Sequence, residues 1–333
     1  DTIEVTASNV SELPKTNSRR YIVYDRISKS MIIGKNEDVK SAMASTTKIM
    51  TTIVILEKAD LNEKVTVSAK AGGTGGSRLG LKRGDKASVR DLLYGLMLRS
   101  GNDAAVALAE HVGGSVKGFA ELMNEKAIEL GLTNTHFVTP HGLDDANHYT
   151  TALELAKLTD YAMDNETFAK IVGTKSTTIY INNQSRQINN TNELLGVLNG
   201  VVGVKTGFTN NAGRCLVTET KRNNMDIITI VLGADTKKDR TKDSVNLIEY
   251  TMSQYKMCNL EEQIIKEFNK WKNINEKRIL IIKGKTSNPK LALGAIEKAI
   301  IPICDNDKIE YSINALTEAK APVEQWNVMG TLT

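Results

Sequence analysis

The alternation of apolar and polar positions predicts a pair of strands near the start of the chain, followed by a buried helix. Two apolar runs, residues 21–25 and 30–34, are separated by a polar segment of hairpin length. The next apolar run, residues 49–56, leaves no broad polar stripe, which is typical of a helix buried on every side. We therefore expect a central buried helix from residue 44 to residue 60.

The same pattern predicts further helices and an antiparallel meander. Helices are expected over residues 89–98, from 104 onward, over 117–132, over 151–164 and, as a closing helix, over 239–257. Either Thr150 or Thr151 is expected to cap the helix over 151–164. Strand patterns fall at 177–181, 214–220 and 226–233, with residues 204–206 beginning the meander.

The length of the chain and a change of character near residue 258 predict two domains. A chain of 333 residues is longer than one typical domain. After residue 258 the pattern is one of short strand-like runs, such as 278–283 and 308–313. We expect a larger domain over 1–258 and a small β-rich domain over 259–333.

Composition and charge exclude several classes of protein. With 41% apolar and 25% charged residues, the chain has the composition of an ordinary globular protein. Its net charge of +4 indicates no nucleic-acid partner. No apolar run is long enough to span a bilayer, and Cys215, Cys258 and Cys304 form no Cys-x-x-Cys pair. The chain starts at Asp1 without a methionine, as a processed or trimmed chain would.

Two segments suggest ligand sites that their context does not support. The glycine-rich residues 72–77 lack the flanking strand and helix of a phosphate-binding loop, so we expect a flexible surface loop. Residues 135–148 hold three of the four histidines, but no His-Glu-x-x-His pattern is present. We expect hydrogen bonds to stabilise this loop, and we expect no metal and no other cofactor.

Ser45 and Lys48 lie three residues apart at the start of the predicted central helix. On a helix this spacing places both side chains on one face, and a hydroxyl and an amine held together can act as nucleophile and base. A lysine in such apolar surroundings must be paired or neutral. Taken alone, however, a Ser-x-x-Lys pair occurs by chance in many proteins.

Two further short motifs follow this pair. Ser100 and Asn102 lie on a tight connection between two apolar helices, where they could present polar groups to a cleft or cap the second helix. Lys205, Thr206 and Gly207 form the third motif. Three such motifs in this order are typical of class A β-lactamases and penicillin-binding proteins.

With these motifs, the chain resembles the low-molecular-mass penicillin-binding proteins that act as D-alanyl-D-alanine carboxypeptidases, of the penicillin-binding protein 5 type (serine peptidase family S11). Other segments that look like this family are 92–95, 100–105, 140–143, 190–195 and 203–207. The resemblance implies a transpeptidase/β-lactamase-like α/β (α+β) domain. Its antiparallel sheet would be flanked by helices and a helical subdomain, and a small β-rich domain would follow.

The resemblance also implies a role for each motif residue. Ser45 would attack the carbonyl of the penultimate D-alanine after Lys48 has taken its proton. Burial and the second cation, Lys205, would lower the pKa of Lys48. Ser100 would relay a proton to the leaving D-alanine, and Asn102 would hydrogen-bond the peptide amide of the substrate.

Further residues are implied in holding the oxyanion and the terminal carboxylate. The backbone N–H groups of Ser45 and Phe208 would bind the oxyanion, and Gly207 would leave room for a substrate lying along the strand. Read without the resemblance, Arg240 could also be a surface residue of the charged run 237–240. The donors implied for the terminal carboxylate of the substrate are Lys205, Thr206, Thr209 and Arg240.

The implied function is that of a serine-type D-Ala-D-Ala carboxypeptidase that trims peptidoglycan stem pentapeptides and is acylated by β-lactams. The protein would act outside the cytoplasm, on the outer face of the bacterial cytoplasmic membrane or secreted. Family members often carry a C-terminal amphipathic helix that holds them on the membrane surface. Residues 330–333 look like a strand, so peripheral attachment would depend on a tail that this sequence does not contain.

Two alternatives share the same motifs. One is a β-lactamase of the same fold, although the Glu-x-x-Leu-Asn pattern that positions a deacylating water in class A enzymes does not occur between Asn102 and Lys205. The other is a non-catalytic protein that senses penicillin or binds the cell wall, although the nucleophile and base residues are all present.

Overall fold

The computed structural model describes residues 12–305, 307–324 and 327–333. These residues form two compact units, one of Leu13–Ser253 and one that contains Gln254–Thr333. Strand β10 (Tyr255–Asn259) pairs with β12 (Ile300–Cys304) inside the second unit. The boundary predicted at residue 258 falls inside β10, so the first unit ends a few residues earlier than the sequence pattern suggests.

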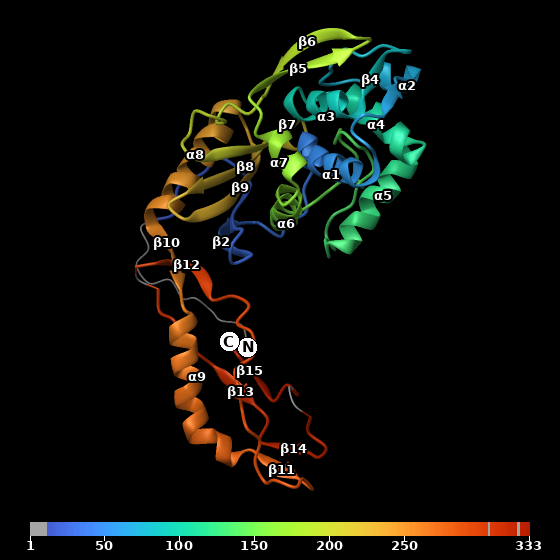
Figure 1. Cartoon of the computed structure of the whole chain (residues 1–333). Helices are drawn as coiled ribbons and strands as arrows, with labels where there is room; N and C mark the ends of the chain where they lie inside the picture. The colour runs from blue at the N-terminus through green and yellow to red at the C-terminus, as the bar shows by residue number, and fades with distance from the viewer. Residues whose placement is uncertain (1–11, 306, 325–326) are drawn as a thin grey trace. The chain divides into compact units, whose positions relative to one another are not determined.

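The first unit is built on a five-stranded antiparallel sheet in the order β2-β1-β9-β8-β7 (Figure 1). This confirms the predicted strand pair and meander. Strand β7 begins a few residues before the predicted start at 204. The strands span Arg20–Asp25 (β1), Ser30–Lys35 (β2), Val201–Thr209 (β7), Gly213–Arg222 (β8) and Met225–Ala234 (β9).

Helices cover both faces of this sheet, and its central strands β8 and β9 are buried on both faces. Helix α6 (Ala152–Met163) packs against β1 and β9, and α8 (Lys237–Gln254) lies along the other face (Figure 1). The side chain of Thr151 accepts a hydrogen bond from the backbone N–H of Glu154 at 3.1 Å. Thr151 is therefore the cap of α6, which decides between the two predicted caps.

A helical region beside the sheet holds the predicted central helix, which the structure divides in two. A 3-10 turn, η1 (Ala44–Thr47), leads into α1 (Lys48–Lys58). Every residue of α1 from Lys48 to Ile55 is buried, which confirms the helix that is buried on every side. The helices around it are α3 (Val89–Leu98), α4 (Asn102–Gly113), α5 (Val116–Glu129) and α7 (Glu166–Val172).

The polar segment before β7 contains structure that the hydrophobic pattern did not predict. The sequence pattern did not predict helix α7 or strand β6 (Gln184–Asn189). Strand β6 has one buried residue with polar side chains around it, so it shows no apolar alternation. Asn182 and Asn183 form the turn between β5 (Ser176–Ile181) and β6 with positive φ angles, which asparagine tolerates. Strands β5 and β6 form a small sheet together with β3 (Lys64–Thr66) and β4 (Lys86–Ser88).

The second unit is β-rich but also contains a helix that the sequence pattern missed. Its strands pair two by two: β10 with β12, β11 (Leu280–Ile282) with β14 (Glu318–Lys320), and β13 (Ile313–Ala315) with β15 (Gly330–Leu332). Helix α9 (Glu261–Asn275) contributes no buried side chain. The strand predicted at 308–313 was wrong, since only its last residue belongs to β13.

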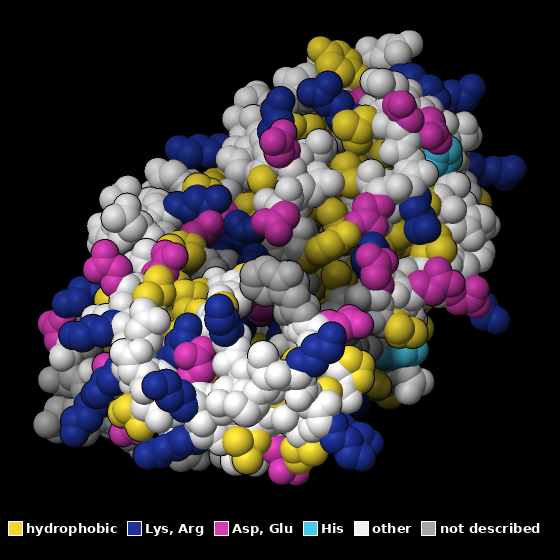
Figure 2. All heavy atoms as spheres, turned by 60° about the horizontal axis from the view of Figure 1, so that its bottom comes forward, with side chains coloured by type: hydrophobic (Ala, Val, Ile, Leu, Met, Phe, Trp, Pro, Cys, Tyr) yellow, Lys and Arg dark blue, Asp and Glu magenta, His cyan; other side chains and the backbone are white. Residues whose placement is uncertain are grey.

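Within the described residues, no helix is long and apolar enough to cross a membrane. On the face drawn in Figure 2, basic and acidic side chains are interspersed and no continuous basic area is visible. This mixed surface agrees with the small net charge of +4.

A buried ionic cluster joins the sheet to α6. The Arg26 guanidinium, 8% exposed, donates to Asp160 at 2.9 Å and to Glu219 at 2.6 Å. Glu219 is fully buried, and burial together with the neighbouring Asp226 raises its pKa to about 7. Without the arginine, Asp160 would keep the half-exposed Lys29 as a counter-charge and Glu219 the half-exposed Lys221.

We expect Arg26→Ala to lower the free energy of unfolding by about 3–5 kcal/mol, because it removes the buried cation that pairs with Asp160 and Glu219. Urea denaturation followed by circular dichroism measures this change. The control is Arg19→Ala, which removes an exposed pair with Asp235 and should cost about 0–1 kcal/mol. Equal effects of the two substitutions would contradict the assigned role of the cluster.

Candidate active site

The start of the central helix brings Ser45 and Lys48 into direct contact. Lys48 Nζ lies 2.9 Å from Ser45 Oγ, because the 3-10 turn and the first turn of α1 place residues three apart on one side. The lysine is fully buried and its Nζ also contacts Asn102 Oδ1 at 2.7 Å and the carbonyl oxygen of His141 at 2.9 Å. Lys48 is thus the point where three segments of the chain meet.

Two buried lysines face this region, and both have lowered pKa values. Burial lowers the pKa of Lys48 well below its ordinary value, the charge of Lys205 lowers it further, and only Asp103 opposes the shift. Lys205, 1% exposed, has its pKa lowered to about 7 by burial and by the charge of Arg240. Its Nζ donates to the carbonyl oxygen of Thr206 at 3.0 Å.

Ser100 and Asn102 lie at the start of α4, and neither of them caps it. The N-cap is Gly101, which offers no side chain, so the cap interpretation was wrong. Asn102 bridges two segments, since its Oδ1 contacts Lys48 and its Nδ2 donates to the carbonyl oxygen of Gly75 at 2.8 Å. Ser100 is buried with φ +58°, and its hydroxyl has no hydrogen-bond partner among the described residues.

The glycine-rich segment lies at the surface, as predicted, and it also contacts the start of α4. The Asp103 carboxylate accepts hydrogen bonds from three consecutive backbone N–H groups, those of Leu79, Gly80 and Leu81, at 2.8–2.9 Å. A Cβ atom on Gly76 would lie 2.6 Å from Asn102 Nδ2. The glycines therefore allow a close approach to Asn102, a signal that glycine content alone does not distinguish from a mobile loop.

The histidine-containing loop is held by hydrogen bonds, as predicted, and it forms one wall of the site. Its His148 contacts the Thr47 hydroxyl at 2.7 Å. Burial lowers the pKa of His148 to about 4 and that of His141 to about 3, so both rings are neutral near pH 7. Among the residues described, no three histidine, cysteine, aspartate or glutamate side chains are grouped to hold a metal ion.

Strand β7 runs against the turn that carries Ser45. A Cβ atom on Gly207 would lie 3.1 Å from the backbone nitrogen of Ser45 and 3.3 Å from the carbonyl oxygen of Met43. The glycine therefore permits close packing of β7 on η1. This role is structural and does not depend on bound substrate. Phe208 beside it is 46% exposed, and the Arg214 guanidinium stacks on its ring at 3.7 Å.

Three of the four residues implied as carboxylate donors, Thr206, Thr209 and Arg240, contact a residue from another segment. The Thr209 hydroxyl donates to Asp144 at 2.6 Å, and Arg240 Nη2 donates to Glu193 at 2.8 Å. Arg240 is 4% exposed, so it is not a surface residue of a charged run. Sequence reasoning missed Asp144 and Glu193 as partners of these residues, because a loop carboxylate gives no local signal of a contact far along the chain. The hydroxyl of Thr206 lies 2.8 Å from that of Thr191.

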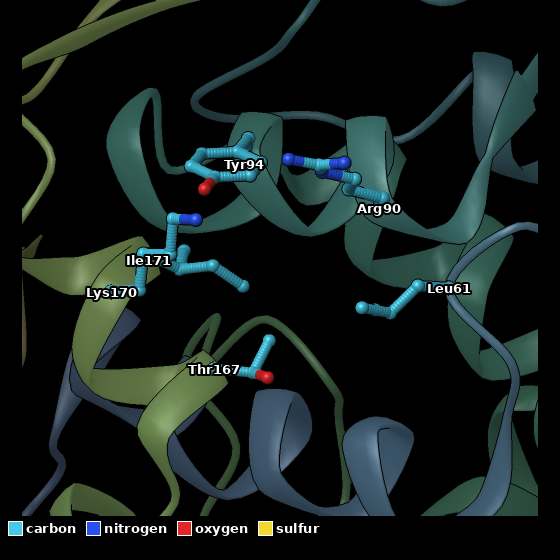
Figure 3. A pocket seen from close by; sticks show the side chains of 6 residues that line it. All are labelled: Leu61, Arg90, Tyr94, Thr167, Lys170 and Ile171. Atoms are coloured by element: carbon cyan, nitrogen blue, oxygen red, sulfur yellow. The ribbon is translucent and has the colours of Figure 1, made fainter.

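Two cavities elsewhere in the first unit are lined by none of the predicted site residues. One has a volume of about 240 Å³ and the other about 520 Å³, and Arg90 and Tyr94 of α3 line both. In the smaller one, Lys170 and Thr167 of α7 face these two side chains (Figure 3). Neither cavity is lined by Ser45 or Lys48, so the assignment of the site rests on the chemistry of its residues and not on cavity volume.

Comparison with known proteins identifies the family. The family model for D-alanyl-D-alanine carboxypeptidases, peptidase S11, matches residues 6–236. The chain is 32% identical to D-alanyl-D-alanine carboxypeptidase DacF of Bacillus subtilis over 93% of this chain and 79% of that protein. It is also 32% identical to D-alanyl-D-alanine carboxypeptidase DacA of Haemophilus influenzae, over 95% and 80% of the two chains.

A solved structure agrees with these sequence relatives. The crystal structure of the Streptomyces K15 DD-transpeptidase superposes with a TM-score of 0.69 at 34% identity, covering 72% of this chain and 98% of that one. The fold is therefore that of penicillin-binding DD-peptidases, as expected from the motifs. The protein belongs to the peptidase S11 family of D-alanyl-D-alanine carboxypeptidases.

The packing of the loop on the Ser45 turn leads to a prediction for Gly142. A Cβ atom there would lie 1.9 Å from the carbonyl oxygen of Ala44, and its φ is +85°. We expect Gly142→Ala to displace the turn and to slow acylation of the protein by a fluorescent penicillin about 100-fold.

The matched control for this prediction is Gly84→Ala. Gly84 has a similar φ of +89°, but nothing lies within 4 Å of the position that a Cβ atom would take there. Backbone strain is therefore similar, and the steric clash is missing. Acylation of the control should remain at the wild-type rate, and a matching loss in both variants would show that strain rather than displacement of Ser45 is responsible.

Proposed function

We propose that the protein removes the terminal D-alanine from peptidoglycan stem pentapeptides through an acyl-enzyme on Ser45, and that β-lactams acylate the same serine. The observation that carries this proposal is the 2.9 Å contact between Ser45 Oγ and the buried amine of Lys48. Membership of the peptidase S11 family supports it. Because its substrate is peptidoglycan, the protein would act outside the cytoplasm, at the outer face of the membrane or secreted.

The contacts of Lys48 suit a general base. A neutral amine has two N–H donors and one lone pair. The Asn102 side-chain oxygen and the His141 carbonyl oxygen accept from the two donors, so the lone pair faces the hydroxyl of Ser45. Lys48 then takes the proton of Ser45 as Oγ attacks the carbonyl carbon of the penultimate D-alanine.

The remaining residues complete the reaction. The backbone N–H groups of Ser45 and Phe208 stabilise the oxyanion, a contribution typically of about 3 kcal/mol for one donor. Ser100, which is buried beside Asn102, passes a proton to the nitrogen of the leaving D-alanine. Water then hydrolyses the ester on Ser45, which regenerates the serine and releases the shortened peptide.

Substrate recognition falls to the residues around β7. Asn102 binds the peptide amide of the substrate, and its position beside Lys48 supports this role. Lys205 and Arg240 supply positive charge for the terminal carboxylate, and the hydroxyls of Thr206 and Thr209 add donors. Gly207 keeps the strand close to Ser45.

Modification of Ser45 is the decisive test. We expect mass spectrometry to find benzylpenicillin covalently bound to the wild-type protein at Ser45, and to find none on Ser45→Ala. The wild type should also release D-alanine from a peptide that ends in D-Ala-D-Ala, and the variant should not.

The same experiment separates the alternatives. Rapid loss of the penicilloyl group with turnover of penicillin would indicate a β-lactamase. Stable acylation without release of D-alanine would indicate a penicillin-sensing protein. Either result would overturn the carboxypeptidase assignment.

The lowered pKa of Lys48 predicts the pH dependence of acylation. A base is active only when neutral, so the rate should rise with pH through the pKa of Lys48 and level off above it. We expect the midpoint of this rise to lie well below the ordinary lysine pKa of about 10.4, because burial lowers the pKa of Lys48. Rates of acylation by a fluorescent penicillin over a pH series measure it.

The companion variant is Lys48→Arg, whose guanidinium stays protonated at all accessible pH values. It should lose about 10²–10⁴-fold in acylation rate, the usual contribution of general base catalysis. An acid limb at the ordinary lysine value, or an active arginine variant, would contradict the role of Lys48 as base.

A further inference from the structure

Arg240 is held in an asymmetric way. The side chain is 4% exposed, and its Nη2 donates to Glu193 at 2.8 Å and to the Thr241 hydroxyl at 3.4 Å. Its Nε is enclosed and has no partner among the described residues. Nη1 makes no hydrogen bond in the described part of the chain either, and it is not among the enclosed atoms. One edge of the guanidinium is therefore fixed, and the Nη1 end is open.

Glu193 is the group that fixes this edge. Its Oε1 accepts hydrogen bonds from Arg240 and from the Thr241 hydroxyl, and its Oε2 lies 2.5 Å from Lys237 Nζ. The carboxylate is 30% exposed and has a lowered pKa: burial opposes the shift, but these three donors outweigh it. Glu193 therefore remains ionised near neutral pH and keeps its charge beside Arg240.

The backbone on both sides of Glu193 is anchored. The side chain of Asn192 donates to the carbonyl oxygen of Gly203 at 3.0 Å and accepts from the N–H of Leu194 at 3.1 Å. Both Asn192 and Leu194 are 4% exposed. A residue between two buried neighbours cannot swing away easily, so Glu193 is placed as a fixed support rather than as a mobile competitor for Arg240.

We propose that Glu193 is a positioning residue that holds the Arg240 guanidinium by its Nη2 edge and leaves Nη1 open for the terminal carboxylate of the substrate. This inference rests on the proposed carboxypeptidase function, and it adds to that function a residue outside the three motifs. Fixing a long cationic side chain before the substrate arrives reduces the entropy lost on binding. The benefit is confined to ligands that carry a carboxylate.

The experiment compares Glu193→Ala with the wild type on one peptide and two penicillins. For a peptide ending in D-Ala-D-Ala, we expect KM to rise about tenfold and kcat to stay within about twofold, because binding and not chemistry is affected. Acylation by benzylpenicillin should slow about tenfold. Acylation by the methyl ester of benzylpenicillin, which has no carboxylate, should be unchanged relative to the wild-type rate on that ester.

Two further variants sharpen the test. Glu193→Gln keeps an oxygen that can accept from Arg240 but removes the charge, and a charge-assisted hydrogen bond is about twice as strong as a neutral one. Its KM should lie between those of the wild type and Glu193→Ala. The matched control is Glu249→Ala, which breaks the 2.9 Å pair between Glu249 and Arg222, another glutamate–arginine pair that involves α8. It should leave KM unchanged.

Each other outcome overturns the inference. An unchanged KM shows that Arg240 needs no support, and a lowered KM shows that Glu193 competes with the substrate. An equal loss on benzylpenicillin and its methyl ester, with a lowered midpoint of thermal unfolding, shows a purely structural role. If the wild-type protein is not acylated at Ser45, the proposed function fails. If the wild type is acylated and the Glu193 variants behave like the wild type, the positioning role of Glu193 alone fails.

Discussion

The fully buried amine of Lys48 is the interaction on which the arrangement of the site depends. It contacts the hydroxyl of Ser45, the side chain of Asn102 and the backbone of His141, and thereby ties together η1, the start of α4 and the histidine-containing loop. A charge in this place is costly, and Lys205 makes it more so. The fold therefore favours the neutral amine, the form that can accept a proton. Burial of Lys48 is therefore the common cause of the cost of a charge at this position and of the reactivity of the neutral amine.

The parts of the structure that were predictable are those in which chemistry or packing leaves a local pattern. The antiparallel sheet, the buried helix and the three motifs could all be read from short stretches, since apolar alternation and residue spacing act over a few positions. The contact between Ser45 and Lys48 was predictable for the same reason. Helix α9 was missed although Ile264, Phe268 and Trp271 recur in it at helical spacing; none of its side chains is fully buried. Polar strand β6 was missed because it has a single buried residue.

Other parts of the site could not be read from the sequence because they join segments far apart in the chain. Glu193 and Asp144 bind donors on α8 and β7, yet both lie in loops, and the sequence does not distinguish Asp144 from the adjacent Asp145. The glycine-rich segment is mostly exposed, as a surface loop would be, but its approach to Asn102 could not be read from its glycine content. Glycine permits both flexibility and close packing. Long-range contacts of this kind determine how the motif residues are supported.

The contact between Gly142 and the carbonyl oxygen of Ala44 has a consequence for how such a site can change. The loop and the nucleophile's turn share a surface with no spare volume, so neither can gain an atom there unless the other retreats. Substitutions in one segment should depend strongly on the residues present in the other. Libraries that aim to alter the specificity of the protein would therefore sample more functional variants if residues 43–46 and 140–144 were varied together than if each segment were varied alone.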